Sequence, residues 1–396
     1  MEIKKMKTIL FLFFGIGHID NVAGTEKVFV NMANAFSQRG YRVIAIYNDS
    51  PGKKPFYAVD EKVELINLAM GKIFPPISKK ILREVYRIFK FKITNPVEIY
   101  KSEMFAKKIE EKIKNSEIYS VVCFEYNSVV VANKLGITPR IAMVHNCIDE
   151  LIKPLTKKEL EQANKMTAYQ VLMPSFVKEA QRYLSTEIVY IPNAIDKVTL
   201  ARQEKQISDR NKHTIICIGR LEAEQKQQHI LLQAFALLAD KYPQWEVDIY
   251  GLGYNLERDA YKEELLHIIN KYKMEKQVHL KGVTDKILEK MCQADILAMP
   301  SAYEGFSMVL GDAMSIGLPA VGFVNAPSVN ELIVNNVTGI LCADTVKDYA
   351  AGLEKLMCND KLRRELGDNA YLAAQEYSAE KVWNKWENLF KRLHEQ

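Results

Sequence analysis

Cysteine is scarce in this sequence, and no two cysteines have the spacing of a metal or redox motif. The chain has 396 residues and 6 cysteines, without a Cys-X-X-Cys pair. Most of the six lie in apolar surroundings. This pattern argues against a disulfide framework and against a zinc site, and it favours buried, reduced thiols in a cytoplasmic protein.

Long apolar runs are also absent. No stretch reaches the roughly 18 to 20 apolar residues that are needed to cross a bilayer. The apolar run Thr8 to Phe14 follows three lysines and superficially imitates a signal peptide. It continues into Gly15-Ile16-Gly17 without a small-residue cleavage pattern, so we expect a first buried strand instead of a leader.

The excess of positive charge is small. Lysine and arginine number 54 against 49 acidic residues, a net charge of +5, and 48% of residues are hydrophobic. Such a composition is typical of a folded globular protein. A modest positive charge without a binding motif argues against a nucleic-acid partner. Apart from His145, the histidines show no metal-ligand spacing, so we expect no metal and no other cofactor.

Short apolar runs alternate with helical patterns along the whole chain. Strands are expected near 7–14, 41–47, 120–124, 140–144, 169–173, 188–191, 214–218, 246–250, 277–280 and 295–299. This alternation predicts an α/β fold with parallel sheets and with ligands at the carboxyl ends of the strands. The length suits two domains of about 200 residues. A polar stretch from Arg202 to Lys212 predicts a boundary after residue 196.

The most informative segment runs from Pro300 to Pro319. An apolar run before it predicts a buried strand, and helical spacing begins near Ser307. Glu304 and Asp312 therefore bracket a strand-to-helix turn. Unpaired N–H groups at the start of such a helix suit a phosphate or another anion. For this segment alone, a solvated Glu304 and a helix-starting Asp312 remain an alternative.

Other predicted strand ends also carry polar or glycine residues. Gly219-Arg220 and Lys226 lie in a loop before a helix that contains Leu231 and Phe235. Ala23-Gly24 opens a helical pattern. The pair Gly15 and Gly17 suggests a dinucleotide fingerprint, but Asp20 stands where a third glycine is needed, which disfavours a dehydrogenase.

Taken together in chain order, these segments resemble those of the retaining nucleotide-sugar glycosyltransferases of family four, which have the GT-B fold. The resemblance rests on Ala23-Gly24, His145, Ile191-Pro192-Asn193, Gly219-Arg220, Lys226, Glu304 to Asp312, and Gly317-Leu318-Pro319. It implies two Rossmann-like, doubly wound domains facing across a cleft, with the last helix crossing back to the first domain. The acceptor-binding domain would then comprise residues 1–196 and 378–396, and the donor-binding domain residues 197–377.

The resemblance also implies roles for individual residues. Arg220 and Lys226 would hold the departing diphosphate, whose new negative charge fixed cations can stabilise without a metal. Glu304 and His145 would meet the sugar or the reacting centre, with a structural role as the alternative for His145. Asp312, where the family usually has Glu, would hold the ribose. The full donor-binding set is Gly24, Gly219, Val283, Gly305, Phe306, Ser307, Met308 and Asp312; Glu331 and Gly339 are treated as structural.

The function implied is transfer of a hexose or N-acetylhexosamine from a nucleoside diphosphate sugar, with UDP favoured, to a hydroxyl. The resemblance also implies retention of configuration. Metal independence is expected as well, since the sequence has no Asp-X-Asp triplet. The expected acceptor is a growing cell-surface glycan, such as capsule or lipopolysaccharide, or a lipid-linked oligosaccharide. Alternatives are a sugar-nucleotide epimerase, a phosphorylase, or a non-catalytic sugar-nucleotide binding protein.

A basic amphipathic segment spans residues 72–92. At about 3.6 residues per turn, its cations cluster on one side and its apolar residues on the other. The cations are Lys79, Lys80, Arg83, Arg87 and Lys90, and the apolar residues are Ile77, Ile81, Val85, Ile88 and Phe89. Such a helix suits peripheral contact with an anionic membrane, at the inner face of the cytoplasmic membrane. The alternative is a helix that buries Ile81 and Val85 in the first domain.

Overall fold

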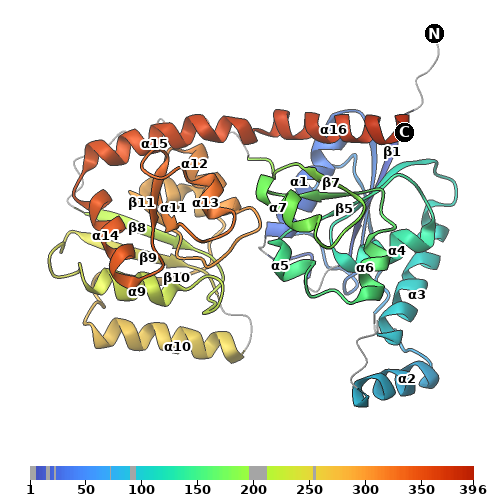
Figure 1. Ribbon diagram of the computed structural model, residues 1–396, viewed down its shortest axis with the longest axis horizontal. Coiled ribbons are helices and arrows are strands. Elements are labelled where there is room, and N and C mark those ends of the chain that lie inside the picture. The colour runs from blue at the N-terminus through green and yellow to red at the C-terminus, as the bar shows by residue number, and fades with distance from the viewer. Residues whose placement is uncertain are drawn as a thin grey trace, which may run out of the picture. The chain divides into compact units, whose positions relative to one another are not determined.

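The computed structural model describes residues 6–14, 18–21, 24–71, 73–89, 95–195, 212–252 and 256–396 (Figure 1). Its contacts divide the chain into unit 1, which is Met1–Asn193 with Val382–Gln396, and unit 2, which is Ala194–Lys381. The boundary predicted after residue 196 lies outside the described residues. The second boundary lies inside the last helix, whose first turn is grouped with unit 2, and not before that helix.

Unit 1 contains a parallel sheet of seven strands in the order β3-β2-β1-β4-β5-β6-β7. The strands are β1 (Thr8–Phe13), β2 (Arg42–Tyr47), β3 (Glu64–Asn67), β4 (Ile118–Cys123), β5 (Arg140–Met143), β6 (Ala168–Val171) and β7 (Glu187–Tyr190). The helices are α1 (Gly24–Gln38), α2 (Ile77–Ile88), α3 (Pro96–Ile113), α4 (Tyr126–Leu135), α5 (Ile148–Leu151), α6 (Lys157–Ala163) and α7 (Pro174–Ala180).

The first strand is buried along its whole length, as the sequence predicts. β1 pairs with β2 on one side and β4 on the other. Phe11 packs edge-on against Phe36 of α1 and Phe124, with ring centroids 6.4 and 5.5 Å apart. These aromatic contacts hold α1 against the sheet. The apolar run Thr8 to Phe14 therefore lies in the hydrophobic core of unit 1.

Unit 2 contains a parallel sheet of six strands in the order β10-β9-β8-β11-β12-β13. The strands are β8 (His213–Ile218), β9 (Trp245–Tyr250), β10 (Val278–Gly282), β11 (Ile296–Ala298), β12 (Ala320–Phe323) and β13 (Gly339–Cys342). The helices are α9 (Gln228–Ala236), α10 (Leu256–Lys271), α11 (Ile287–Gln293), α12 (Met308–Ser315), α13 (Val329–Leu332), α14 (Val346–Met357) and α15 (Asp360–Ala374), followed by the 3₁₀ turn η1 (Gln375–Tyr377).

The last helix, α16 (Ala379–Glu395), packs against α1 of unit 1. Trp383 and Phe390 both contact the ring of Phe36, at centroid distances of 6.0 and 5.4 Å. The predicted return of the C-terminal helix to the first domain is thereby confirmed.

Ten strands lie where the sequence predicts them, and the two parallel sheets confirm the α/β class. The analysis missed β3, β12 and β13. β3 is a four-residue strand at the sheet edge, only half-buried, so its apolar signal is weak. β12 and β13 are equally short, and their glycines, Gly322 and Gly339, lower the strand propensity. Within the described residues, no helix is long and apolar enough to cross a bilayer.

All six cysteines are free, and five of them are buried. The buried thiols are those of Cys123, Cys147, Cys217, Cys292 and Cys342, whereas Cys358 is exposed. The expected burial of the thiols is confirmed for these five.

Candidate functional site

Two of the predicted catalytic residues form an ion pair in unit 2. The Lys226 Nζ lies 2.6 Å from the Glu304 Oε1, and the two side chains are only 18% and 8% exposed. Lys226 comes from the loop before α9, and Glu304 from the turn before α12. Low exposure keeps water from weakening this pair. The structure thus brings together a cation and a carboxylate that are 78 positions apart in the sequence.

A buried glutamine joins the two loops that carry this pair. The Ala302 N–H donates to the Gln225 carbonyl at 2.8 Å, and the Gln225 Nε2 donates to the Tyr303 carbonyl at 3.2 Å. Gln225 is 6% exposed. These bonds fix the lysine loop against the turn before Glu304, so Gln225 is a positioning residue. The sequence analysis missed it because nothing in its spacing marks a side chain that bonds backbone.

Arg220 lies at the other end of the same loop. Its side chain is 44% exposed, and its guanidinium donates to the Gln225 Oε1 at 3.1 Å and pairs with Glu222 at 3.3 Å. Gln227, just before α9, has a left-handed φ of 49°. Arg220 is therefore held near the pair through Gln225 and stays accessible.

Three strand ends meet beside Arg220. The Gly219 N–H donates to the Tyr250 carbonyl at 3.0 Å, and the Gly251 N–H donates to the Gly282 carbonyl at 2.8 Å. A Cβ on Gly251 would lie 1.8 Å from the Gly219 carbonyl oxygen, so only glycine fits. Val283, which follows this junction, is 49% exposed. The predicted Gly219 and Val283 therefore follow β8 and β10, the two strands that flank β9. Gly251 follows β9 between them, and the sequence analysis missed it.

The predicted helix start at Ser307 is confirmed. The Ser307 Oγ accepts the Leu310 N–H at 3.3 Å as the N-cap of α12. Gly305, Phe306 and Ser307 are buried, and Met308 is half-buried. Asp312 is half-buried on α12, four residues after Met308 and thus on the same helix face. The remaining N–H groups of this first turn have no carbonyl partner within the helix, an arrangement that suits an anion.

A buried thiol lies close enough to the Lys226–Glu304 pair to respond to its charges. Burial raises the pKa of Cys217 to about 12, while Lys226 lowers this pKa and Glu304 raises it. Cys217 belongs to β8. It is therefore a neutral thiol at physiological pH, and the charged side chains beside it include Lys226 and Glu304.

His145 and Gly24 belong to unit 1. Gly24 is exposed at the first position of α1, and its predicted neighbour Ala23 lies outside the described residues. His145 follows β5 and stacks on Phe124, with ring centroids 5.8 Å apart. Its Nε2 is buried and has no hydrogen-bond partner among the described residues. Burial lowers the pKa of His145 to about 4, so the imidazole is neutral at physiological pH and cannot serve as a cation.

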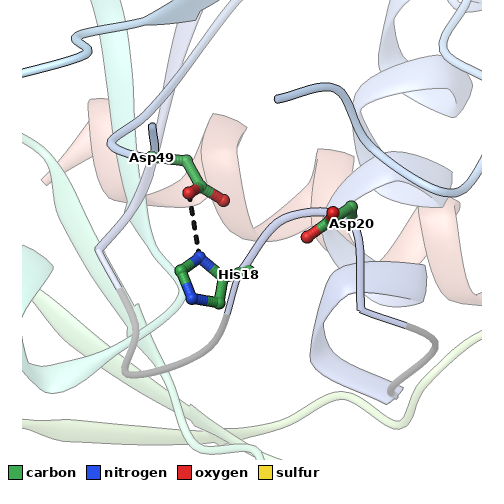
Figure 2. A group of neighbouring side chains, drawn as sticks. All are labelled: His18, Asp20 and Asp49. Carbon is green, nitrogen blue, oxygen red and sulfur yellow. Dashed lines mark hydrogen bonds and ion pairs between the residues drawn. The ribbon is translucent and has the colours of Figure 1, made fainter. Parts of the chain in front are cut away.

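A polar cluster at the ends of β1 and β2 was missed by the sequence analysis. The nearest ligand atoms of His18, Asp20 and Asp49 lie within 4.8 Å of one another (Figure 2). Asp20 forms an ion pair with Lys53. The Asp49 Oδ1 contacts His18 at 2.9 Å, and its Oδ2 accepts the Ile19 N–H at 3.0 Å. Protein donors thus already use these oxygens, and we treat the cluster as a hydrogen-bonded group, not as a metal site.

Comparison with known proteins identifies a family model that matches within unit 2 and relatives that match along nearly the whole chain. A family model described as glycosyl transferases group 1 matches residues 200–373. An uncharacterized glycosyltransferase of Haemophilus influenzae is 27% identical over 390 residues, which cover 97% of this chain and 100% of the relative. The amylovoran biosynthesis glycosyltransferase AmsD of Erwinia amylovora is 24% identical over 392 residues, covering 97% of this chain and 99% of that one.

A solved structure of similar fold covers almost the entire chain. The pneumococcal O-GlcNAc transferase GtfA, in complex with UDP and GlcNAc, superposes with a TM-score of 0.75 at 16% identity. The match covers 99% of this chain and 100% of that chain. This likeness confirms the two-domain fold that the sequence resemblance implies.

Proposed function

We propose that this chain is a group 1 glycosyltransferase, because that family model matches residues 200–373 and a glycosyltransferase is 27% identical over 97% of the chain. It moves a hexose or N-acetylhexosamine from a UDP-sugar to a hydroxyl of a cell-surface glycan or lipid-linked acceptor, with retention of anomeric configuration and without a metal. UDP is favoured because GtfA binds it in a similar fold. A glycan acceptor is favoured because AmsD, which this chain resembles over nearly its whole length, acts in amylovoran biosynthesis.

The observation that carries this proposal is the shielded pair of Lys226 and Glu304. In the free protein, the ammonium and the carboxylate neutralise each other. An entering diphosphate competes for the ammonium and leaves Glu304 free to orient the sugar and to stabilise positive charge at its anomeric carbon. Arg220 and the start of α12 supply further donors for the phosphates.

In the proposed reaction, the acceptor oxygen attacks the anomeric carbon on the face that the diphosphate leaves. The new carbon–oxygen bond forms as the bond from carbon to the β-phosphate oxygen breaks, and its electron pair departs with UDP. A phosphate oxygen of the leaving group takes the acceptor proton. Lys226 and Arg220 stabilise the charge that develops on the diphosphate, so no metal is required for charge balance.

Thermal unfolding with UDP, GDP, ADP and their sugars, each with a chelator present, tests donor binding. A ligand at about 100 times its Kd adds roughly 2.7 kcal/mol and raises the midpoint by several degrees. We expect UDP and one UDP-sugar to stabilise the chain selectively. No shift with any nucleotide would contradict the proposal. Stabilisation that requires a divalent cation would contradict only its metal independence.

Turnover separates a transferase from the alternatives. With the stabilising UDP-sugar and a panel of lipid-linked sugars, we expect UDP release to require an acceptor, whereas an epimerase would convert the donor alone and a phosphorylase would need phosphate. Lys226→Ala and Glu304→Gln should each lower the rate roughly 10²-fold. The matched control is Lys347→Ala, at an exposed lysine of α14. A folded chain that binds UDP without turnover would indicate a non-catalytic binding protein.

We also propose that α2 holds the chain at an anionic membrane, at the cytoplasmic face where a lipid-linked acceptor would be reached. None of the 12 residues of α2 is buried. Ile81 is 59% exposed and Val85 36%, so the alternative that they are buried in the first domain is wrong. Lys90 lies outside the described residues.

The proposed membrane surface consists of α2 and the residues that flank it. Its large exposed apolar side chains are Phe74, Ile77, Ile81, Leu82, Val85, Ile88 and Phe89. Apolar bulk beside basic charge is what an anionic lipid surface binds. Co-sedimentation with vesicles of phosphatidylglycerol and phosphatidylcholine, against phosphatidylcholine alone, tests this. Equal recovery in the supernatant of both would refute the membrane proposal and leave the transferase proposal untouched.

A further inference from the structure

His18 and Asp49 form a solvent-facing dyad in unit 1. The His18 Nδ1 lies 2.9 Å from the Asp49 Oδ1, and the histidine side chain is 64% exposed while the aspartate is only 2% exposed. Asp49 follows β2, and His18 lies in the connection from β1 to α1. The two therefore occupy the carboxyl ends of neighbouring parallel strands, which is the edge where α/β sheets bind ligands (Figure 2).

Asp49 is fixed as an ionised acceptor. The Ile19 N–H donates to its Oδ2 at 3.0 Å, and the Ser50 N–H donates to its Oδ1 at 2.6 Å. Burial by itself would raise the pKa of Asp49, but the hydrogen bonds from His18, Ser50 and Ile19 hold it below its ordinary value. A carboxylate can only accept hydrogen bonds.

The tautomer of His18 follows from this acceptor. Because Asp49 accepts, the His18 Nδ1 carries the proton, and the Nε2 of the neutral ring keeps its lone pair. The ring is mostly exposed, so this lone pair is an acceptor available to a ligand. The backbone that carries the ring is anchored, since Ile19 is 1% exposed and the Asn21 N–H donates to the His18 carbonyl at 3.0 Å.

The charges around the dyad select the chemistry of the ligand. Asp49 and Asp20 are carboxylates, and Lys53, a cation that joins the cluster, is paired with Asp20. A phosphate would meet negative charge and a lone pair here, whereas a hydroxyl can donate its proton to the Nε2. The cluster therefore suits a neutral hydroxyl compound and not an anion.

We infer that His18 binds the sugar acceptor by accepting a hydrogen bond from one of its hydroxyl groups at Nε2, with Asp49 as the residue that sets its tautomer. This inference rests on the proposed function, because it assigns to unit 1 the acceptor of that reaction. His18 is a binding residue here, and the acceptor proton of the transfer step still leaves with the diphosphate.

The variant His18→Asn distinguishes a role of His18 in binding the acceptor from a structural role as the partner of Asp49. The asparagine amide can replace the Nδ1–H and keep the bond to Asp49, but it has no atom at the Nε2 position. With UDP-GlcNAc as donor and undecaprenyl-diphosphate-linked GlcNAc as acceptor, we expect the KM for the acceptor to rise about 5- to 10-fold, which is the loss of one hydrogen bond. The KM for UDP-GlcNAc and the affinity for UDP should stay within about twofold. His267→Asn, at an exposed histidine of α10, is the matched control.

Nitrogen NMR of the labelled chain tests the dyad without any ligand. We expect the His18 ring to show a protonated Nδ1 and an unprotonated Nε2 at pH 8, and Asp49→Asn to mix the tautomers and to raise the acceptor KM by a smaller factor. A wild-type ring with mixed tautomers, or an acceptor KM unchanged in His18→Asn, would overturn the inference. Failure of the wild-type chain to bind UDP would instead count against the proposed function, while the NMR experiment still decides the dyad.

Discussion

Two helices, α2 and α16, share an amphipathic pattern of apolar and charged residues but differ in what covers their apolar faces. On α16, Trp386 and Phe390 are at most 1% exposed, and the helix packs against α1. On α2, Ile77 and Ile88 are 74% and 70% exposed. The same helical periodicity therefore produces a buried face in one case and an open face in the other. Periodicity shows that a helix has an apolar face, but it does not identify the partner of that face.

The cations of the two helices differ in the same way. On α16, Arg392 pairs with Glu187 at 2.5 Å, and Lys385 lies 5.3 Å from the ring centroid of Tyr190. On α2, Lys79 and Lys80 have no ion pair within the described residues. Glu84 forms ion pairs with Arg83 and with Arg87, each at 2.7 Å. Arg392 and Lys385 of α16 thus contact residues of unit 1, while Lys79 and Lys80 of α2 have no such partner among the described residues.

The largest expected effect tests the covered face. Trp386→Ala should destabilise the chain by about 3–5 kcal/mol, because it opens a cavity beneath α16. Ile88→Ala on α2 should change stability by less than about 0.5 kcal/mol in solution, because its side chain is already in water. Urea unfolding of both variants measures the difference. Comparable losses would mean that α2 is packed against something in solution, such as a second copy of the chain.

The next effect concerns the open face. Ile81→Glu combined with Ile88→Glu should lower the partition onto phosphatidylglycerol vesicles at least about 150-fold, since two buried apolar side chains are each worth roughly 1.5–3 kcal/mol. The unfolding midpoint should stay near that of the wild type. Vesicle co-sedimentation and urea unfolding decide together. A large loss of stability without a loss of lipid binding would show that the face is structural.

The sequence predicts features that depend on neighbouring residues in the chain better than features that depend on contacts between residues far apart in the chain. The helix start at Ser307 and the strands around Arg220 could be predicted, because caps and apolar runs are local. Gln225 and Gly251 could not, because their roles depend on carbonyl groups of distant strand ends. The bond between His18 and Asp49 spans 31 positions and leaves no motif. The open face of α2 was undecided for the same reason.

A smaller effect distinguishes the cations. Lys79→Gln and Lys80→Gln should each weaken binding to anionic vesicles about fivefold, as one cation near such a surface contributes about 1 kcal/mol. Lys391→Gln, at an exposed lysine of α16, is the matched control and should change binding little. The loss should shrink as salt is raised, because screening weakens the attraction. Equal effects of all three substitutions would indicate that vesicle binding depends on the net charge of the chain and not on the cations of α2.

The smallest effect at neutral pH concerns an ion pair that helps to fasten α16. Arg39 pairs with Glu387 at 2.9 Å, and both side chains are partly exposed. Glu387→Gln should cost about 0.5–1 kcal/mol at pH 7.5, whereas Glu84→Gln on α2 should cost less.

The cost of removing Glu387 should also depend on pH, because this carboxylate acts on Tyr41. Burial, and secondarily Glu387, raise the pKa of Tyr41 to about 12, so the folded chain holds this proton more tightly than the unfolded chain. Stability is therefore lost as the pH rises from about 10 toward 12, and Glu387→Gln should reduce that loss. The deficit of Glu387→Gln relative to wild type should then stay unchanged up to about pH 10.5 and shrink as the pH approaches 12 in urea unfolding, while that of Glu84→Gln stays constant throughout. A constant deficit in both would show that Glu387 holds α16 through Arg39 alone.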